Sequence, residues 1–220
     1  MNTGTVAILD LTKEKQTGDF CVHLSTLRKE NNKRVFQLTS AHSGEGCTTF
    51  AVNVARLLAA REKNSNVLLI DANFQNPQLF NCFELAPKPG FQQLLAKDFT
   101  DSDAINQVEP RNLYVMFTGT ETRNPDCQLS VEQLTETFDG LRKRFDFILI
   151  DSVPIMSSHN AIAIALASDE TFLVIQSGRS NIKVLQNAVS KFTDHNCTLN
   201  SAVLNRIHRP IPSWLYQWLY

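Results

Sequence analysis

The chain has 220 residues, which is enough for one domain of ordinary size with a full hydrophobic core. Hydrophobic residues make up 43% and charged residues 20%, as is typical of a globular protein in water. The formal net charge of −1 excludes a strongly basic chain, so we expect no nucleic acid as a partner.

No apolar run approaches the ~20 residues that a membrane-spanning helix needs, and residues 1–20 lack the apolar core of a signal peptide. The five cysteines form no C-x-x-C pair, which predicts neither a zinc site nor a disulfide framework and suits a reducing compartment. We therefore expect a cytoplasmic protein that meets a membrane only peripherally, through a partner.

The N-terminal part begins with residues 5–10, which could form an extended arm or an edge strand, and continues with polar residues 11–18, predicted as a loop. Apolar residues spaced by four and three predict a helix over residues 19–31. The apolar run 35–38 is typical of a buried strand. A glycine loop follows it, and then an apolar helical stripe to about residue 60.

The rest of the chain alternates apolar runs with helical stripes. Strands are predicted at residues 67–71, 113–117, 147–151, 171–175 and 202–204. Helices are predicted at about residues 78–83, 91–97, 130–144, 159–167 and 182–192, the third beginning at a capping box formed by Ser130 and Gln133. This alternation predicts an α/β fold, a doubly wound and mostly parallel sheet flanked by helices.

We expect one domain over residues 1–220. It would carry an N-terminal arm and helix (about 1–33) and an aromatic C-terminal tail (about 207–220).

The glycine loop has the order of a phosphate cradle, a strand followed by a turn and a helix start. Its residues, all candidates for nucleotide binding, are Ser43, Gly44, Glu45, Gly46, Cys47, Thr48 and Thr49. Against the Walker pattern G-x-x-x-x-G-K-[ST], Ala41 replaces the first glycine and Cys47 replaces the lysine. Thr48 keeps the hydroxyl that would bind Mg²⁺. The alternative is a strand–turn–helix kept only for packing.

Cys47 has neither the reach nor the charge of the lysine that contacts the β- and γ-phosphates. A thiol at a helix N-terminus is also expected to ionise more readily, which would place negative charge against a phosphate. Nucleotide binding, as ATP or ADP with Mg²⁺, is therefore predicted more readily than fast phosphoryl transfer.

Polar residues follow several of the predicted strands, at the edge of the sheet where ligands of such folds bind. They are the glycine loop, Asp71, Asp151, Gln176 and Asn205. Asp71 and Asp151 are candidates for catalysis and, with Thr48, for holding Mg²⁺. The alternative for each aspartate is that it caps the next turn or helix.

Five stretches together resemble the cytoplasmic catalytic domain of bacterial tyrosine kinases over residues 19–206. They are VFQLTSAHSGEGCTTFAVNVARLLA, VLLIDANFQNPQLFNCFEL, LYVMFTGTETRNPDCQLS, FDFILIDSVPI and AVLNRI. That family consists of deviant-Walker P-loop proteins akin to the MinD and ParA ATPases and is tied to capsule and exopolysaccharide synthesis. The resemblance implies adenine recognition by Asn205, with Arg206 beside it.

The chain departs from the family in its transfer machinery. In the family's D-x-D-x-R stretch Asp71 is kept, but Asn73 and Gln75 replace the second acid and the basic residue. The Walker B residues Asp151, Ser152 and Pro154 are kept.

The family's ring-forming E-x-x-R-x-x-R stretch becomes Val22, Ser25 and Arg28, which makes ring formation by that route doubtful. Of the family's tyrosine-rich tail, Tyr216 and Tyr220 remain as candidate phosphate acceptors. The tail could instead meet a membrane interface or a hydrophobic partner, or pack on its own domain or in a homo-oligomer.

The resemblance and its departures lead to one functional hypothesis. The protein would be a degenerate tyrosine-kinase-like subunit of an exopolysaccharide or capsule system, with a binding or regulatory role and little or no phosphoryl transfer. Its partner would be an inner-membrane polysaccharide co-polymerase or export protein. The alternative is an active tyrosine autokinase or MinD-like ATPase whose missing charge comes from Arg179, Arg206 or a partner's arginine. A third reading is a scaffold that binds no nucleotide.

Overall fold

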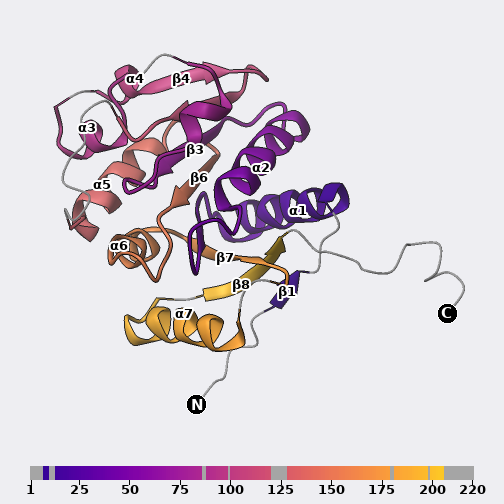
Figure 1. Cartoon of the computed structure of the whole chain (residues 1–220). Helices are drawn as coiled ribbons and strands as arrows, with labels where there is room; N and C mark the ends of the chain where they lie inside the picture. The colour runs from indigo at the N-terminus through magenta and orange to yellow at the C-terminus, as the bar shows by residue number, and fades with distance from the viewer. Residues whose placement is uncertain are drawn as a thin grey trace, which may run out of the picture.

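The computed structural model describes residues 7–9, 13–85, 88–98, 100–119, 128–178, 181–197 and 199–205. These residues form an eight-stranded sheet in the order β1-β8-β7-β2-β6-β3-β5-β4, with helices packed on it (Figure 1). Within the described ranges no helix is both long enough and apolar enough to span a membrane.

The strands have the following bounds: β1 Ala7–Leu9, β2 Val35–Ser40, β3 Val67–Ala72, β4 Ile105–Val108, β5 Leu113–Met116, β6 Phe147–Ser152, β7 Glu170–Gln176 and β8 Leu199–Asn205. The helices are α1 Lys13–Asn31, α2 Cys47–Arg61, the 3-10 helix η1 Leu79–Cys82, α3 Phe91–Leu95, α4 Asp101–Ala104, α5 Val131–Leu141, α6 Asn160–Ala167 and α7 Ile182–Asp194. All neighbouring strands run parallel except β4, which pairs antiparallel with β5.

The sheet is covered on both faces, as predicted. Every residue of β2, β3 and β6 is buried, and successive side chains of a strand enter opposite layers. In β3, Leu69 packs with residues of α1 and α2, whereas Leu68 and Ile70 pack with residues of α3, α5 and α6. A third cluster lies between α6 and α7. The doubly wound α/β fold is confirmed.

Three local predictions differ from the structure. The first helix begins at Lys13, so the loop predicted over residues 11–18 is wrong from that residue onward. Helix α5 ends at Leu141 rather than near residue 144. Its start agrees with the prediction, because the hydroxyl of Ser130 accepts a hydrogen bond from the backbone N–H of Gln133 at 3.3 Å. The antiparallel edge strand β4 was not predicted. The alternative that residues 5–10 hold an edge strand is confirmed by β1, which pairs with β8.

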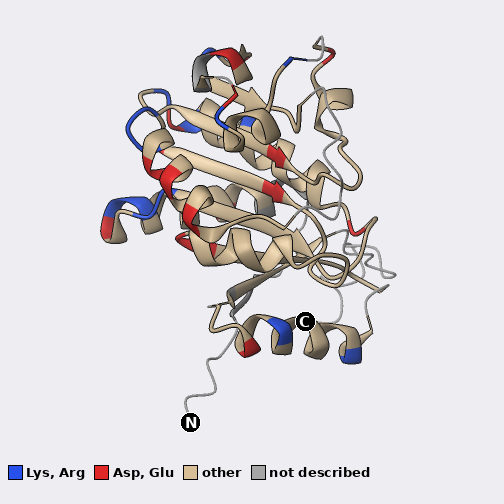
Figure 2. Cartoon of the chain, turned by 90° about the vertical axis from the view of Figure 1, so that its left-hand side faces the viewer, with Lys and Arg blue, Asp and Glu red and all other residues tan. Residues whose placement is uncertain are grey.

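Basic and acidic residues are interspersed along the helices and loops of the chain (Figure 2). At the amino ends of β2, β6 and β7, basic side chains pair with carboxylates: Arg28 with Asp146, Lys33 with Glu170, and Arg142 with Asp169. Asp169 also accepts hydrogen bonds from the backbone N–H groups of residues 34 and 35, at 2.7 and 2.8 Å. These cations therefore stabilise the end of the sheet opposite to the glycine loop.

Candidate phosphate-binding site

The glycine loop lies between the end of β2 and the start of α2. Gly44 and Gly46 have φ angles of 86° and 85°, a region that residues with a β-carbon rarely adopt. Helix α2 begins at Cys47 with no side-chain cap. Because the first N–H groups of an α-helix have no acceptor within the helix, those of α2 are free to bind an anion.

Two polar side chains hold the loop in shape. The Glu45 side chain is buried, and its Oε2 accepts hydrogen bonds from the backbone N–H groups of Ala41 (2.8 Å) and His42 (3.1 Å). Asn205, at the end of β8, donates from Nδ2 to the carbonyl oxygens of Glu45 (3.0 Å) and Gly46 (3.4 Å). Both residues thus contact the loop backbone, while their roles toward a nucleotide stay predictions.

A cavity of about 340 Å³ opens beside the loop. It is lined by Ser40, Ser43, Gly44, Gly46, Cys47, Thr48, Thr49, Asn73, Asn76, Gln78, Asn81, Cys82, Ser152 and Pro154. None of these side chains is a lysine, an arginine or a carboxylate. Arg56 of α2 donates to the carbonyl oxygen of Cys82 (3.1 Å) and is not among the lining residues. The cavity therefore offers a phosphate backbone N–H groups and hydroxyls, and none of the described residues that line it offers a cation.

Cys47 is buried at the first position of α2. Burial raises the pKa of its thiol well above the ordinary value, and the nearby carboxylates of Asp151, Glu45 and Asp71 raise it further. The expectation that this thiol ionises more readily is therefore wrong, because burial among carboxylates outweighs the helix N-terminus. Cys47 presents a neutral S–H group to the cavity.

Asp151, at the end of β6, is 1% exposed. Neither of its carboxylate oxygens accepts a hydrogen bond of normal geometry from a described residue. Burial raises its pKa to about 6, and the Thr48 hydroxyl and Cys47 thiol lie close enough to moderate that rise. A buried carboxylate without a partner, beside a hydroxyl, fits a hard cation such as Mg²⁺. Within the described residues no group of three or more His, Cys, Asp and Glu could hold a metal by itself.

Asp71 lies directly opposite Asp151 in the register of β3 and β6. Its Oδ1 accepts from the backbone N–H of Asn73 (3.0 Å) and its Oδ2 from that of Leu79 (3.1 Å). Burial and the Asp151 charge raise its pKa to about 7. Asp71 therefore caps the turn after β3, as the alternative prediction had it, while its role toward Mg²⁺ stays a prediction.

A family model described as an AAA domain matches residues 33–203, which include the loop, Asp71 and Asp151. The chain belongs to this AAA-domain family.

Named relatives of this AAA-domain protein include the tyrosine-protein kinase CpsD of Streptococcus pneumoniae, which is 29% identical over 175 residues, covering 79% of this chain and 76% of the relative. The crystal structure of the VpsO kinase domain is 27% identical, with a TM-score of 0.75 over 89% of this chain and 97% of that one. The MinD cell division protein of Aquifex aeolicus shares the fold, with a TM-score of 0.65 at 20% identity over 80% of this chain and 70% of that one. The resemblance to bacterial tyrosine kinases and the MinD-like fold is thereby confirmed.

Sequence reasoning missed most of the cavity wall opposite the loop. Asn76, Gln78, Asn81 and Cys82 of this AAA-domain protein all line the cavity, and only Asn73 had been singled out, as a substitution. The available signal was the run NFQNPQLFNC directly after the strand that ends at Asp71, since residues that follow a parallel strand lie at the ligand edge.

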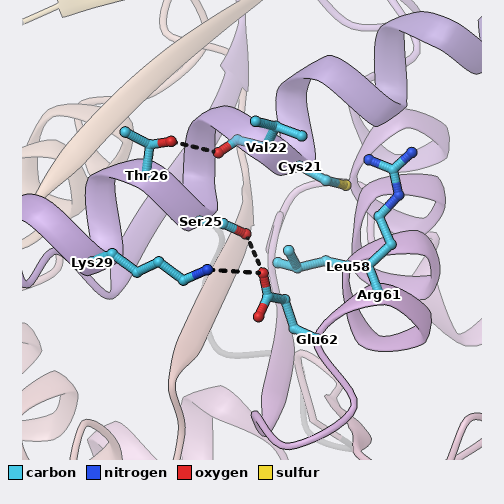
Figure 3. A pocket seen from close by; sticks show the side chains of 8 residues that line it. All are labelled: Cys21, Val22, Ser25, Thr26, Lys29, Leu58, Arg61 and Glu62. Atoms are coloured by element: carbon cyan, nitrogen blue, oxygen red, sulfur yellow. Dashed lines mark hydrogen bonds and ion pairs between the residues drawn. The ribbon is translucent and has the colours of Figure 1, made fainter.

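The positions of the ring-forming stretch lie on α1, and two of them, Val22 and Ser25, line a second cavity of about 200 Å³ between α1 and α2 (Figure 3). Val22 is 58% exposed, and Ser25 donates from its hydroxyl to Glu62 Oε1 at 2.8 Å. Lys29 contacts the same carboxylate at 3.9 Å. Arg28 is paired with Asp146 of its own chain. These contacts are all made within one chain. We therefore still predict that ring formation through this stretch is doubtful.

Four further predicted residues, Arg179, Arg206, Tyr216 and Tyr220, lie outside the described residues.

Proposed function

We propose that this AAA-domain protein is a nucleotide-binding regulatory subunit of a capsule or exopolysaccharide system, with little or no phosphoryl transfer. The observation that carries the proposal is the uncharged cavity beside the loop, in which a neutral, buried Cys47 takes the position of the Walker lysine. The loop backbone and Thr48 remain in place to bind a nucleoside diphosphate or triphosphate.

Phosphoryl transfer depends on positioning and on charge stabilisation, because negative charge spreads over the transferred group. In this cavity the described lining residues supply no cation, and the buried acidic side chains of Glu45, Asp71 and Asp151 lie nearby. A Mg²⁺ ion held by Asp151 and Thr48 would supply part of that charge; the lysine's contact to the β- and γ-phosphates would still be missing. Binding without efficient turnover follows from this arrangement.

The proposed context rests on the relatives, which are named as tyrosine-protein kinases, CpsD and CapB among them. By this analogy the protein would act in the cytoplasm and dock on an inner-membrane polysaccharide co-polymerase or export protein. Tyr216 and Tyr220 would be acceptors only if an active kinase reached them.

The test uses purified full-length protein free of other kinases, incubated with labelled ATP and Mg²⁺. We expect nucleotide binding by calorimetry without label transfer to tyrosine. Transfer by the wild type that Asp151→Asn abolishes would overturn the proposal, and absence of any nucleotide binding would favour the scaffold reading.

A second candidate is an active kinase or ATPase that receives its cation from elsewhere. The unbonded Asp151 carboxylate beside Thr48 favours it, because this pair could still hold Mg²⁺. Arg179, Arg206 or a partner's arginine would then act as an arginine finger. Phosphate release that rises when the partner is added, and falls again with Arg206→Ala or Arg179→Ala, would support this candidate.

A further inference from the structure

The cavity wall opposite the glycine loop is made of side-chain amides. The cavity is lined on this side by Asn73, Asn76 and Gln78, which lie between β3 and η1, and by Asn81 of η1. Asn73 Oδ1 accepts from the backbone N–H of Asn76 (3.2 Å), Gln78 Nε2 donates to Asn76 Oδ1 (2.9 Å), and Asn81 Nδ2 donates to Gln78 Oε1 (3.3 Å). The last two bonds join the side-chain amides of Asn76, Gln78 and Asn81 in series, while the Asn73 side chain holds the backbone of Asn76.

The wall keeps hydrogen-bonding capacity for a ligand. Among the hydrogen bonds of the described residues, none involves Nδ2 of Asn73, Nδ2 of Asn76 or Oδ1 of Asn81. An amide nitrogen carries two donors and an amide oxygen two acceptor positions. Neutral donors and acceptors placed side by side match hydroxyl groups, each of which both donates and accepts, better than they match the acceptor-only oxygens of a phosphate.

The charges around the cavity favour a ligand of low negative charge. Among the described residues its lining contains no lysine or arginine, and the buried Asp151 carboxylate lies near Thr48 and Cys47 without a hydrogen bond of normal geometry. Each additional phosphate charge would therefore meet the Asp151 carboxylate with only a bound Mg²⁺, and no cationic side chain of the described residues, to offset the repulsion. A terminal phosphate in ATP or ADP adds such a charge, whereas a sugar joined to a diphosphate removes one and replaces it with hydroxyls.

We propose that the cavity takes a nucleoside diphosphate sugar, with the diphosphate on the N–H groups at the start of α2 and the sugar hydroxyls on the amide wall. The inference rests on the proposed function, since it requires that the loop binds a nucleotide diphosphate. The cavity volume of about 340 Å³ lies in the range of small-molecule sites, and Asn76, Gln78 and Asn81 are solvent-exposed, so the sugar would lie at the cavity mouth.

The test compares ADP-glucose with ADP and ATP, each titrated calorimetrically into the full-length protein with Mg²⁺. ADP-glucose and ADP share the base, ribose and diphosphate. They differ in the glucosyl group, which also removes one negative charge from the diphosphate. We expect ADP-glucose to bind at least tenfold more tightly than ADP, and ATP to bind most weakly. Equal or tighter binding of ADP overturns the inference and leaves the proposed function standing; no binding of any of the three overturns both.

A variant pair separates the amide wall from the charge effect. The double substitution Asn76→Ala with Asn81→Ala removes two exposed amides and should lower ADP-glucose affinity about tenfold without changing ADP affinity. Asn187→Ala, which removes an exposed amide from α7, is the matched control and should change neither. A loss of affinity for ADP equal to that for ADP-glucose would mean that the wall contacts the nucleotide, and would overturn the assignment of a sugar to it.

Discussion

Replacing Cys47 with lysine should add the missing cation to the cavity and tighten the binding of Mg-ATP. Cys47 is the first residue of α2 and lines the cavity, so a longer side chain there would extend toward a phosphate on the loop. An ammonium and a phosphate charge ~4 Å apart attract by about 4 kcal/mol at an effective dielectric constant of ~20. Removing the ammonium from water offsets part of this, leaving about 1.5–3 kcal/mol, the value of a hydrogen bond to a charged group.

That gain corresponds to a Kd lowered by roughly 10- to 150-fold, since about 1.4 kcal/mol is a factor of ten. At ligand concentrations far above both dissociation constants, the same free energy appears as extra stabilisation of the folded protein. For a chain of this length, each kcal/mol of added stability raises Tm by about 2–4 °C. The ligand-induced rise in Tm of the Cys47→Lys variant should therefore exceed that of the wild type by roughly 3–12 °C.

The assay is a thermal melt of the wild type and of Cys47→Lys, each with and without millimolar Mg-ATP or Mg-ADP. Subtracting the ligand-free Tm removes any effect of the new ammonium on Asp71, Asp151 and Glu45, which lie near Cys47. Cys47→Met, of similar length but uncharged, is the matched control and should behave as the wild type. An equal gain in the methionine variant, or no gain in the lysine variant, would refute the reasoning that missing charge limits binding.

Three further predictions concern single side chains. The pKa of Asp151 is raised from 3.8 to about 6, so folding disfavours the ionised carboxylate. Asp151→Asn should therefore be more stable than the wild type at pH 8 by up to ~3 kcal/mol, and the difference should vanish as the pH falls to about 4. Urea denaturation across this pH range measures the difference, and a difference that does not change with pH contradicts the prediction. Glu45→Ala leaves two loop N–H groups without their acceptor and should lose ~1.5–3 kcal/mol of stability and most ligand binding. Glu30→Ala, at an exposed position of α1, is the control and should change stability by less than ~0.5 kcal/mol. Asp169→Ala should lower the free energy of unfolding by ~2–4 kcal/mol in the same denaturation assay. The rise in Tm caused by Mg-ADP should persist, because Asp169 lies at the end of the sheet opposite to the glycine loop. Loss of that rise in the variant would show that the two ends of the sheet are coupled.

The buried strands could be predicted because each is a continuous apolar run covered on both faces, as in β3 and β6. The edge strand β4 could not, because its sequence Ile-Asn-Gln-Val has no apolar run and its pairing with β5 is set by tertiary contact. The early start of α1 was missed for a related reason. Its first six residues, KEKQTG, carry no apolar stripe, and apolar periodicity detects only the part of a helix that packs on a core.

The meeting of the loop, Asp71 and Asp151 was predictable, because the carboxyl ends of parallel strands lie at one edge. The directions of the side chains were not. Glu45 could have faced a ligand, but its carboxylate instead binds the backbone of its own loop. The acidity of Cys47 was misjudged because a sequence shows the helix start but not the three carboxylates folded around it.

The placement of charge explains how the loop keeps its shape without a lysine at position 47. Its shape depends on the Glu45 carboxylate, which accepts from the loop backbone, on the Asn205 amide, which donates to it, and on two glycines with positive φ. None of these contacts involves a lysine at position 47. The fold depends on ion pairs at the amino ends of the strands, such as Arg142 with Asp169. Under the proposed function, the missing cation at position 47 would therefore remove transition-state stabilisation without weakening the scaffold, and the site would bind a nucleotide without transferring its phosphate.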